Sequence, residues 1–200
     1  MNLPNKLTVS RFVLTAFFLG ALFCPWQIPF RNTLALFLFC AASFTDFLDG
    51  KIARSRRLIT NFGILMDPLA DKILICSAFV AFVESTHLHA DAPVKVGAWM
   101  VIIIVARELA ITGLRLLAAS KGVVLSAERF GKHKTISQIV AIIALLVTDA
   151  RNEWPSWLQN IFQGWPVAFA EIALWLTVAL TAASGVIYLW RNREIYLSDI

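Results

Sequence analysis

Four aspartates between residues 46 and 71 interrupt a sequence that is otherwise strongly apolar. Asp46 and Asp49 are three residues apart, and Asp67 and Asp71 are four apart, so each pair lies on one face of a helix. A charged side chain at the centre of a membrane helix costs roughly 2.5–3.5 kcal/mol, so four such groups need a compensating partner. Carboxylate oxygens suit Mg²⁺ or Mn²⁺, and two such ions would balance four negative charges. The spacing therefore predicts a two-metal site suited to phosphoryl transfer.

The residues around these aspartates fit a phosphate-binding role. Gly50, Ala53 and Gly63 remove bulk, so that a ligand or another helix can approach closely. Arg54 carries a planar guanidinium that suits a phosphate. The ordinary alternative is that the basic residues of 51–57 do no more than neutralise the acids. The arrangement as two same-face pairs favours a site over this alternative.

A short segment, residues 1–6, precedes the first apolar run and could lie along a membrane surface. Asn5 and Thr8 place two small polar side chains close to the expected interface. Such residues commonly cap a helix N-terminus, where the side-chain oxygen accepts a backbone N–H. From the residue pattern alone, capping and ligand binding both remain open for this pair.

The elements that must position these residues are membrane helices. Of the 200 residues, 58% are hydrophobic, and the mean hydropathy is +0.71, which is far more apolar than a soluble domain. Apolar runs recur along the whole chain, which favours a single all-α membrane domain over residues 1–200. We expect six transmembrane helices, at roughly 7–24, 32–52, 64–85, 93–118, 134–150 and 165–190.

Basic residues are distributed unequally between the two sides of these expected spans. Three of the 18 lysines and arginines, namely Arg31, Lys95 and Arg151, fall on one side, and the other fifteen fall on the opposite side. Because cytoplasmic loops of membrane proteins are enriched in Lys and Arg, both termini and the aspartates are expected to face the cytoplasm.

The aspartate run carries a resemblance to a known family. The pattern Asp46-x₂-Asp49-Gly50-x₂-Ala53-Arg54-x₈-Gly63-x₃-Asp67-x₃-Asp71 is similar, without a departure, to the signature of the CDP-alcohol phosphotransferases. Other stretches resemble a bacterial branch of that family whose acceptor is glycerol 3-phosphate. They are Leu3-Pro4-Asn5-Lys6-Leu7-Thr8 with Arg11, Arg107-Glu108, Gly113-Leu114-Arg115, and Gly131-Lys132-His133-Lys134-Thr135.

This resemblance implies an architecture and a reaction. It implies six membrane helices, usually in a homodimer, around a polar cavity that faces the cytoplasm, in the bacterial inner membrane. It also implies that CDP-diacylglycerol donates its phosphatidyl group to sn-glycerol 3-phosphate and that CMP is released. Lipid and the two substrates would then be the partners of the protein.

The resemblance also implies roles for particular residues. The four aspartates Asp46, Asp49, Asp67 and Asp71 would hold two Mg²⁺ ions, or Mn²⁺, and Asp71 would also be the general base. The CDP part of the donor would contact Asn5, Thr8, Gly50, Arg54 and Thr60.

The acceptor phosphate needs cations of its own. Arg107 and Arg115 are eight residues apart and therefore near one helical face, while Lys132 and Lys134 lie close to the start of the fifth span. These four residues are the candidates for binding glycerol phosphate. The ordinary explanation for each of them is positive-inside charge.

Two other functions compete with this interpretation. A sibling enzyme could use phosphatidylglycerol, inositol phosphate or serine as its acceptor. A divalent-cation transporter would place its acids near the membrane midplane with polar groups on both sides, whereas the outer halves of these spans are almost purely apolar. The sequence has no Gly-rich P-loop and no basic-aromatic surface, so neither nucleotide hydrolysis in solution nor nucleic-acid binding is expected.

Overall fold

The computed structural model describes the backbone over residues 3–24, 29–56, 61–88, 92–123, 125 and 129–197. Within the helices, the side chains of 3–4, 47–56, 61–65 and 129–132 fall outside this description. The predicted site residues Asp49, Gly50, Arg54 and Lys132 are in these stretches, and Thr60 lies outside the described backbone. All regular structure in the described ranges is helical, so the predicted all-α class is confirmed there.

Long helices follow one another through the described residues and supply most of the core. They are α1 (Leu3–Phe23), α2 (Arg31–Arg56), α3 (Asn61–Leu88), α4 (Ala98–Ser120), α5 (Arg129–Ala150) and α7 (Trp165–Arg191). Shorter elements are the 3₁₀ turn η1 (Arg151–Glu153), α6 (Ser156–Ile161) and α8 (Arg193–Leu197).

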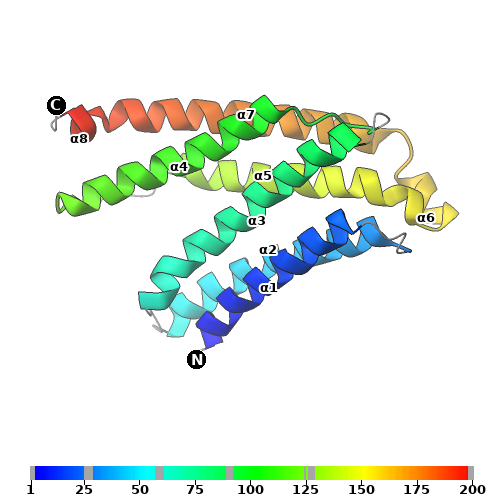
Figure 1. Cartoon of the computed structure of the whole chain (residues 1–200), viewed down its shortest axis with the longest axis horizontal. Helices are drawn as coiled ribbons and strands as arrows, with labels where there is room; N and C mark the ends of the chain where they lie inside the picture. Colours follow the sequence, from blue (N-terminus) through cyan, green and yellow to red (C-terminus); the bar gives the residue numbers. More distant parts are fainter. Residues whose placement is uncertain are drawn as a thin grey trace.

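The helices pack in two groups that meet along α2, α3 and α5 (Figure 1). In one group α1 lies against α2 and α3, and in the other α4 and α5 lie against α7. Large apolar side chains fill the interior of the bundle, with Phe18, Phe39, Phe79 and Ile142 fully buried. The rings of Phe18 and Phe39 are 5.6 Å apart and join α1 to α2. This core holds the polar residues described below in fixed positions.

Three of the described helices are long and apolar enough to cross a membrane. These stretches are Asn5–Phe23, His133–Glu153 and Trp165–Arg191. A fourth helix, α4, has suitable length but carries Arg107, Glu108 and Arg115. Charged residues within a membrane helix are costly and face the interior of the bundle or a polar cavity, so the charges on α4 call for a functional explanation.

Some helix boundaries differ from those expected from hydropathy. The fourth span was expected to begin near residue 93, but α4 begins at Ala98. Val94 and Val96 are buried without being helical, and the backbone N–H of Val96 donates to the Thr86 hydroxyl at 3.1 Å. Buried apolar side chains in a non-helical segment therefore produced the longer hydropathy signal. The described part of 1–6 belongs to α1, which begins at Leu3.

The N-terminus of α2 is capped by a residue far away in the sequence. Glu153 accepts hydrogen bonds from the backbone N–H groups of Asn32 and Thr33 at 2.9 and 2.8 Å, and from the Thr33 hydroxyl at 2.7 Å. The indole N–H of Trp154 also donates to the Thr33 hydroxyl, at 3.0 Å. A carboxylate at a helix N-terminus satisfies unpaired N–H groups and interacts favourably with the helix dipole. Glu153 thereby fixes η1 against α2.

Candidate active site

Two side chains of α1 connect the acidic positions of α2 and α3. Arg11 is fully buried, and its Nη1 lies 2.9 Å from Oδ1 of Asp46. The same nitrogen donates to the backbone carbonyl of Asp67 at 3.4 Å. One turn earlier, the buried Thr8 hydroxyl donates to Oδ1 of Asp67. Three helices thus meet at one acidic end of the bundle.

The position of Thr8 distinguishes between its two possible roles. Because α1 begins at Leu3, Thr8 lies inside the helix, and its hydroxyl bonds to a carboxylate of another helix. Thr8 and Arg11 are three residues apart and share a face of α1, which turns both toward α2 and α3. Thr8 is therefore part of the acidic end and not a helix cap. Asn5 is half-buried within the same helix, one turn before Thr8.

Asp71 lies one turn beyond Asp67 on α3 and belongs to the same polar region. Its carboxylate repels that of Asp46 and is attracted by Arg11, Lys134 and Lys72. Asp46 also repels Asp67. The structure therefore brings together three of the four predicted aspartates, from two helices, although their mutual repulsion is unfavourable.

The chemistry of these groups fits a hard divalent cation. Hydrogen bonds from Arg11 and Thr8 engage Oδ1 of Asp46 and of Asp67, and each carboxylate has a second oxygen. The Asp46 side chain is 43% exposed and therefore accessible to a ligand. Among the described side chains, no three His, Cys, Asp or Glu groups are close enough to hold one ion. A complete ligand set thus requires Asp49, whose side chain lies outside the described residues, or oxygens from a substrate.

A second charged cluster joins side chains of α4 and α5. Lys134 of α5 is buried and donates to Oε1 of Glu108, and Arg107 Nη1 lies 3.3 Å from the same oxygen. One carboxylate thus holds two cations, which leaves the cluster with net positive charge. On α3, Lys72 donates to the Thr112 hydroxyl of α4.

Arg115 extends this basic cluster by two turns along α4. Its Nε donates to the Tyr188 hydroxyl of α7 at 3.3 Å, and its Cζ lies 5.7 Å from the centre of the Tyr188 ring. The positive charges of Arg115 and Arg107 both repel that of Lys72. Arg107, Arg115 and Lys134, together with Lys72, thus form a basic region that an anion would stabilise.

The acidic end and the basic cluster are adjacent. Asp71 interacts electrostatically with Lys134 and with Lys72, and Lys134 interacts in turn with Arg107. Asp71 therefore interacts both with Asp46 of the acidic end and with two cations of the basic cluster, Lys72 of α3 and Lys134 of α5. A metal-bound diphosphate on one side and an anionic acceptor on the other would both lie near this carboxylate.

Comparison with known proteins shows the family of this chain. A profile of the CDP-alcohol phosphatidyltransferase family matches residues 1–183. The chain belongs to this family. It is 39% identical to the CDP-diacylglycerol–glycerol-3-phosphate 3-phosphatidyltransferase of Bacillus subtilis, with 96% of each chain covered. It is 34% identical to the proteins of the same name from Haemophilus influenzae (100% of this chain, 97% of the relative) and Escherichia coli K12 (99% and 98%).

The resemblance predicted from the aspartate run is thus confirmed. Apart from Asn5, which lies on α1 one turn before Thr8, the predicted residues whose side chains are described fall into two sets in this member of the family. The acidic end contains Thr8, Asp46, Asp67 and Asp71, and the basic cluster contains Arg107, Arg115 and Lys134. The predicted residues Asp49, Gly50, Arg54 and Lys132 lie in helical stretches described by their backbone alone, and Thr60 lies outside the described residues.

Sequence reasoning gave no site role to four residues that hold these sets in place, although two of them, Arg11 and Glu108, belong to stretches that resemble the family. The four are Arg11, Lys72, Glu108 and Tyr188. A signal was present for the three charged ones, because a charge inside an apolar span generally faces a partner or a functional cavity. Tyr188 carried no such signal, since tyrosine is common near the ends of membrane spans.

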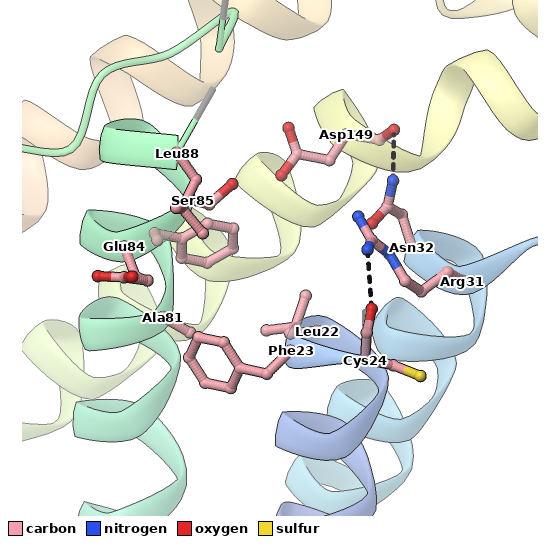
Figure 2. A pocket seen from close by; sticks show the side chains of 11 residues that line it. Leu22, Phe23, Cys24, Arg31, Asn32, Ala81, Glu84, Ser85, Leu88 and Asp149 are labelled. Atoms are coloured by element: carbon pink, nitrogen blue, oxygen red, sulfur yellow. Dashed lines mark hydrogen bonds between the residues drawn. The ribbon is translucent and has the colours of Figure 1, made fainter. Parts of the chain in front are cut away.

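A separate cavity of about 260 Å³ lies at the far ends of α1 and α3 (Figure 2). Arg31 donates to the Cys24 carbonyl at 3.3 Å, and Asn32 donates to the Asp149 carbonyl at 3.3 Å. These hydrogen bonds connect separate segments of the chain. The apolar side chains of Leu22 and Phe82 also line the cavity. Because this cavity lies more than 13 residues along both helices from Thr8 and Asp67, it does not belong to the candidate active site.

Proposed function

We propose that this protein transfers the phosphatidyl group of CDP-diacylglycerol to sn-glycerol 3-phosphate, giving phosphatidylglycerophosphate and CMP. The relatives that match this chain over nearly their full length carry the name of this activity. The observation that carries the proposal is that Asp71 interacts electrostatically both with Asp46 of the acidic end and with Lys72 and Lys134 of the basic cluster. The acidic end suits a metal-bound diphosphate, and the basic cluster suits a phosphorylated acceptor.

The donor would bind at the acidic end. Asp46, Asp67 and Asp71, with Asp49, would hold two Mg²⁺ or Mn²⁺ ions, which would neutralise the diphosphate and stabilise the charge that develops on departing CMP. Arg11 and Thr8 hold Asp46 and Asp67 from α1. Asn5 and Thr8, with Gly50, Arg54 and Thr60, would contact the CDP part.

Asp71 would act as the general base. It would take the proton from the 1-hydroxyl of glycerol 3-phosphate as that oxygen attacks the phosphorus that carries the diacylglycerol. A new phosphorus–oxygen bond forms to the acceptor, and the bond to the CMP phosphate breaks, so that the electron pair leaves with CMP. The position of Asp71 between the two clusters supports this role.

The acceptor phosphate would bind in the basic cluster. Arg107, Arg115 and Lys134, with Lys132, supply more positive charge than a neutral acceptor would need. Glu108 accepts bonds from both Arg107 and Lys134, which keeps these side chains together. A dianionic acceptor is therefore favoured over serine or another acceptor without a phosphate.

The setting that we propose is the bacterial inner membrane. Six spans, with the acidic end toward the cytoplasm, would let the lipid donor arrive laterally and the soluble acceptor arrive from water. The excess of fifteen basic residues over three supports this orientation. Both ends of the chain are marked toward the left of Figure 1, which is compatible with an even number of spans. A homodimer is proposed from the family resemblance.

The test is turnover by the purified protein. It would be incubated with CDP-diacylglycerol, Mg²⁺ and one acceptor at a time, chosen from glycerol 3-phosphate, phosphatidylglycerol, inositol phosphate and serine. We expect CMP and phosphatidylglycerophosphate in equal amounts with glycerol 3-phosphate. CMP release with another acceptor alone would indicate a sibling activity. No CMP with any of them would leave the transferase proposal without support.

A further inference from the structure

The two arginines of the basic cluster, Arg107 and Arg115, are both contacted by residues of α7. Arg107 and Arg115 project from α4 on long side chains that α4 by itself cannot fix in one geometry. Gly185 and Tyr188 are three residues apart on α7, so they share a face, and both are buried. One touches Arg107 and the other bonds to Arg115.

Gly185 provides the space for the base of the Arg107 side chain. A Cβ atom at position 185 would lie 2.8 Å from Cγ of Arg107 and 3.7 Å from its Cβ. Cγ is near the root of the side chain, so it cannot move aside without displacing the whole guanidinium. The Arg107 side chain is 13% exposed, which leaves little room for such a shift. The Arg107 side chain can therefore take this position only because residue 185 has no side chain.

Tyr188 orients Arg115 without using up its binding groups. The tyrosine is 4% exposed and packs with Ile111 and Leu114 of α4, which fixes its ring. Its hydroxyl accepts a bond from Nε of Arg115 at 3.3 Å, and the ring centre lies 5.7 Å from Cζ. The two terminal nitrogens, which bind a phosphate bidentately, are not used in this contact.

We propose that Gly185 and Tyr188 are positioning residues that aim Arg107 and Arg115 at the phosphate of the acceptor. This inference rests on the proposed function, since it assumes that the basic cluster binds a phosphorylated acceptor. It adds that α7, which contributes no cation to the cluster among its described residues, determines the affinity for that acceptor.

The first test is Gly185→Ala. The variant should raise the KM for glycerol 3-phosphate about tenfold, the scale of a lost charged hydrogen bond. It should change the KM for CDP-diacylglycerol less than about twofold, because the donor lies at the acidic end. Alanine favours a helix more than glycine does, so the melting temperature should not fall through backbone effects. Gly20→Ala is the matched control, because a Cβ atom at that helical glycine has no neighbour within 4 Å.

The second test separates positioning from general packing. If Gly185 acts through Arg107, adding Gly185→Ala to Arg107→Ala should raise the acceptor KM no further. Tyr188→Phe keeps the ring and its packing but removes the hydroxyl, and should raise the acceptor KM severalfold. The effect of Tyr188→Phe should likewise vanish in the Arg115→Ala background.

Three results would overturn the inference. One is an equal rise in both KM values for Gly185→Ala. Another is a further rise in the acceptor KM when Gly185→Ala is added to Arg107→Ala. The third is an unchanged acceptor KM in Tyr188→Phe. Turnover of the unmodified protein with glycerol 3-phosphate is measured first. Failure at that step refutes the proposed function and this inference together, whereas failure of the variants in an active protein refutes the positioning roles alone.

Discussion

Asp71 connects two clusters of opposite charge, and its chemistry can be tested by a change that keeps its shape. In Asp71→Asn the amide cannot take a proton from the attacking hydroxyl, so turnover should fall about 10²–10⁴-fold, the usual contribution of a general base. CDP-diacylglycerol should still bind, because the other carboxylates remain. Radiometric turnover with Mg²⁺ in excess, together with donor binding, checks this. Activity close to that of the unmodified protein would refute the role.

Arg115 has its guanidinium directed by Tyr188 within the basic cluster. Arg115→Ala should raise the KM for glycerol 3-phosphate roughly tenfold or more, because a charged hydrogen bond to the phosphate is lost. The KM for CDP-diacylglycerol should change much less. Steady-state kinetics with each substrate varied in turn would measure the two values. Equal increases in both would argue against an acceptor site at this residue.

Arg11 is one of the residues to which the aspartate pattern assigned no role, and its substitution should affect stability as well as activity. Its bonds to Asp46 and to the Asp67 carbonyl join three helices. Arg11→Ala removes these bonds and should destabilise the fold by about 2 kcal/mol. Thermal unfolding in detergent would detect this as a lower melting temperature. The exposed Lys6, on the same helix, provides the control variant Lys6→Ala.

At the scale of elements, Glu153 is the clearest long-range link. Glu153→Ala would leave the N–H groups of Asn32 and Thr33 without their carboxylate and should cost about 1–2 kcal/mol. The melting temperature should fall while both KM values stay unchanged, because Glu153 lies far from the acidic end. Glu171→Ala, at an exposed position on α7, is the control. An unchanged melting temperature in Glu153→Ala would contradict the capping role.

The helices themselves were largely predictable, and the exceptions have local causes. Hydropathy located each long helix, because apolar runs of the required length leave few alternatives. It placed the fourth span too early because Val94 and Val96 are buried in a non-helical segment. It began the fifth span at residue 134, whereas α5 begins at Arg129, since a helix can continue in polar residues beyond its apolar part.

The candidate site was predictable in its residue types but not in its cross-connections. The spacing of Asp67 and Asp71 placed both on one face of α3, which follows from helix geometry alone. That Thr8 bonds to Asp67, or that Gly185 admits Arg107, depends on how separate helices pack. No spacing within one helix encodes such contacts. Sequence reasoning therefore named the carboxylates and cations that the structure brings near one another, and gave no role to most of the residues that hold them in place.

At the scale of the whole molecule, the candidate site draws its charges from several helices. Asp46, Asp67 and Asp71 lie on α2 and α3, and the cations that interact with them lie on α1, α3 and α5. If divalent ions complete the acidic half, a chelator should abolish turnover, and Mg²⁺ or Mn²⁺ should restore it. Turnover assays before and after chelation, with Ca²⁺ as a comparison ion, would check this. Full activity in excess chelator would exclude the two-metal proposal.

The account depends most on the claim that the acids and the cations form one site. This claim can be measured without turnover, by phosphorus NMR of glycerol 3-phosphate in the presence of Mn²⁺, whose unpaired electrons broaden nearby nuclei. We predict strong broadening with the unmodified protein, and much weaker broadening at the same free Mn²⁺ with either Asp67→Asn or Arg115→Ala. Equal broadening in all three proteins would contradict a shared site.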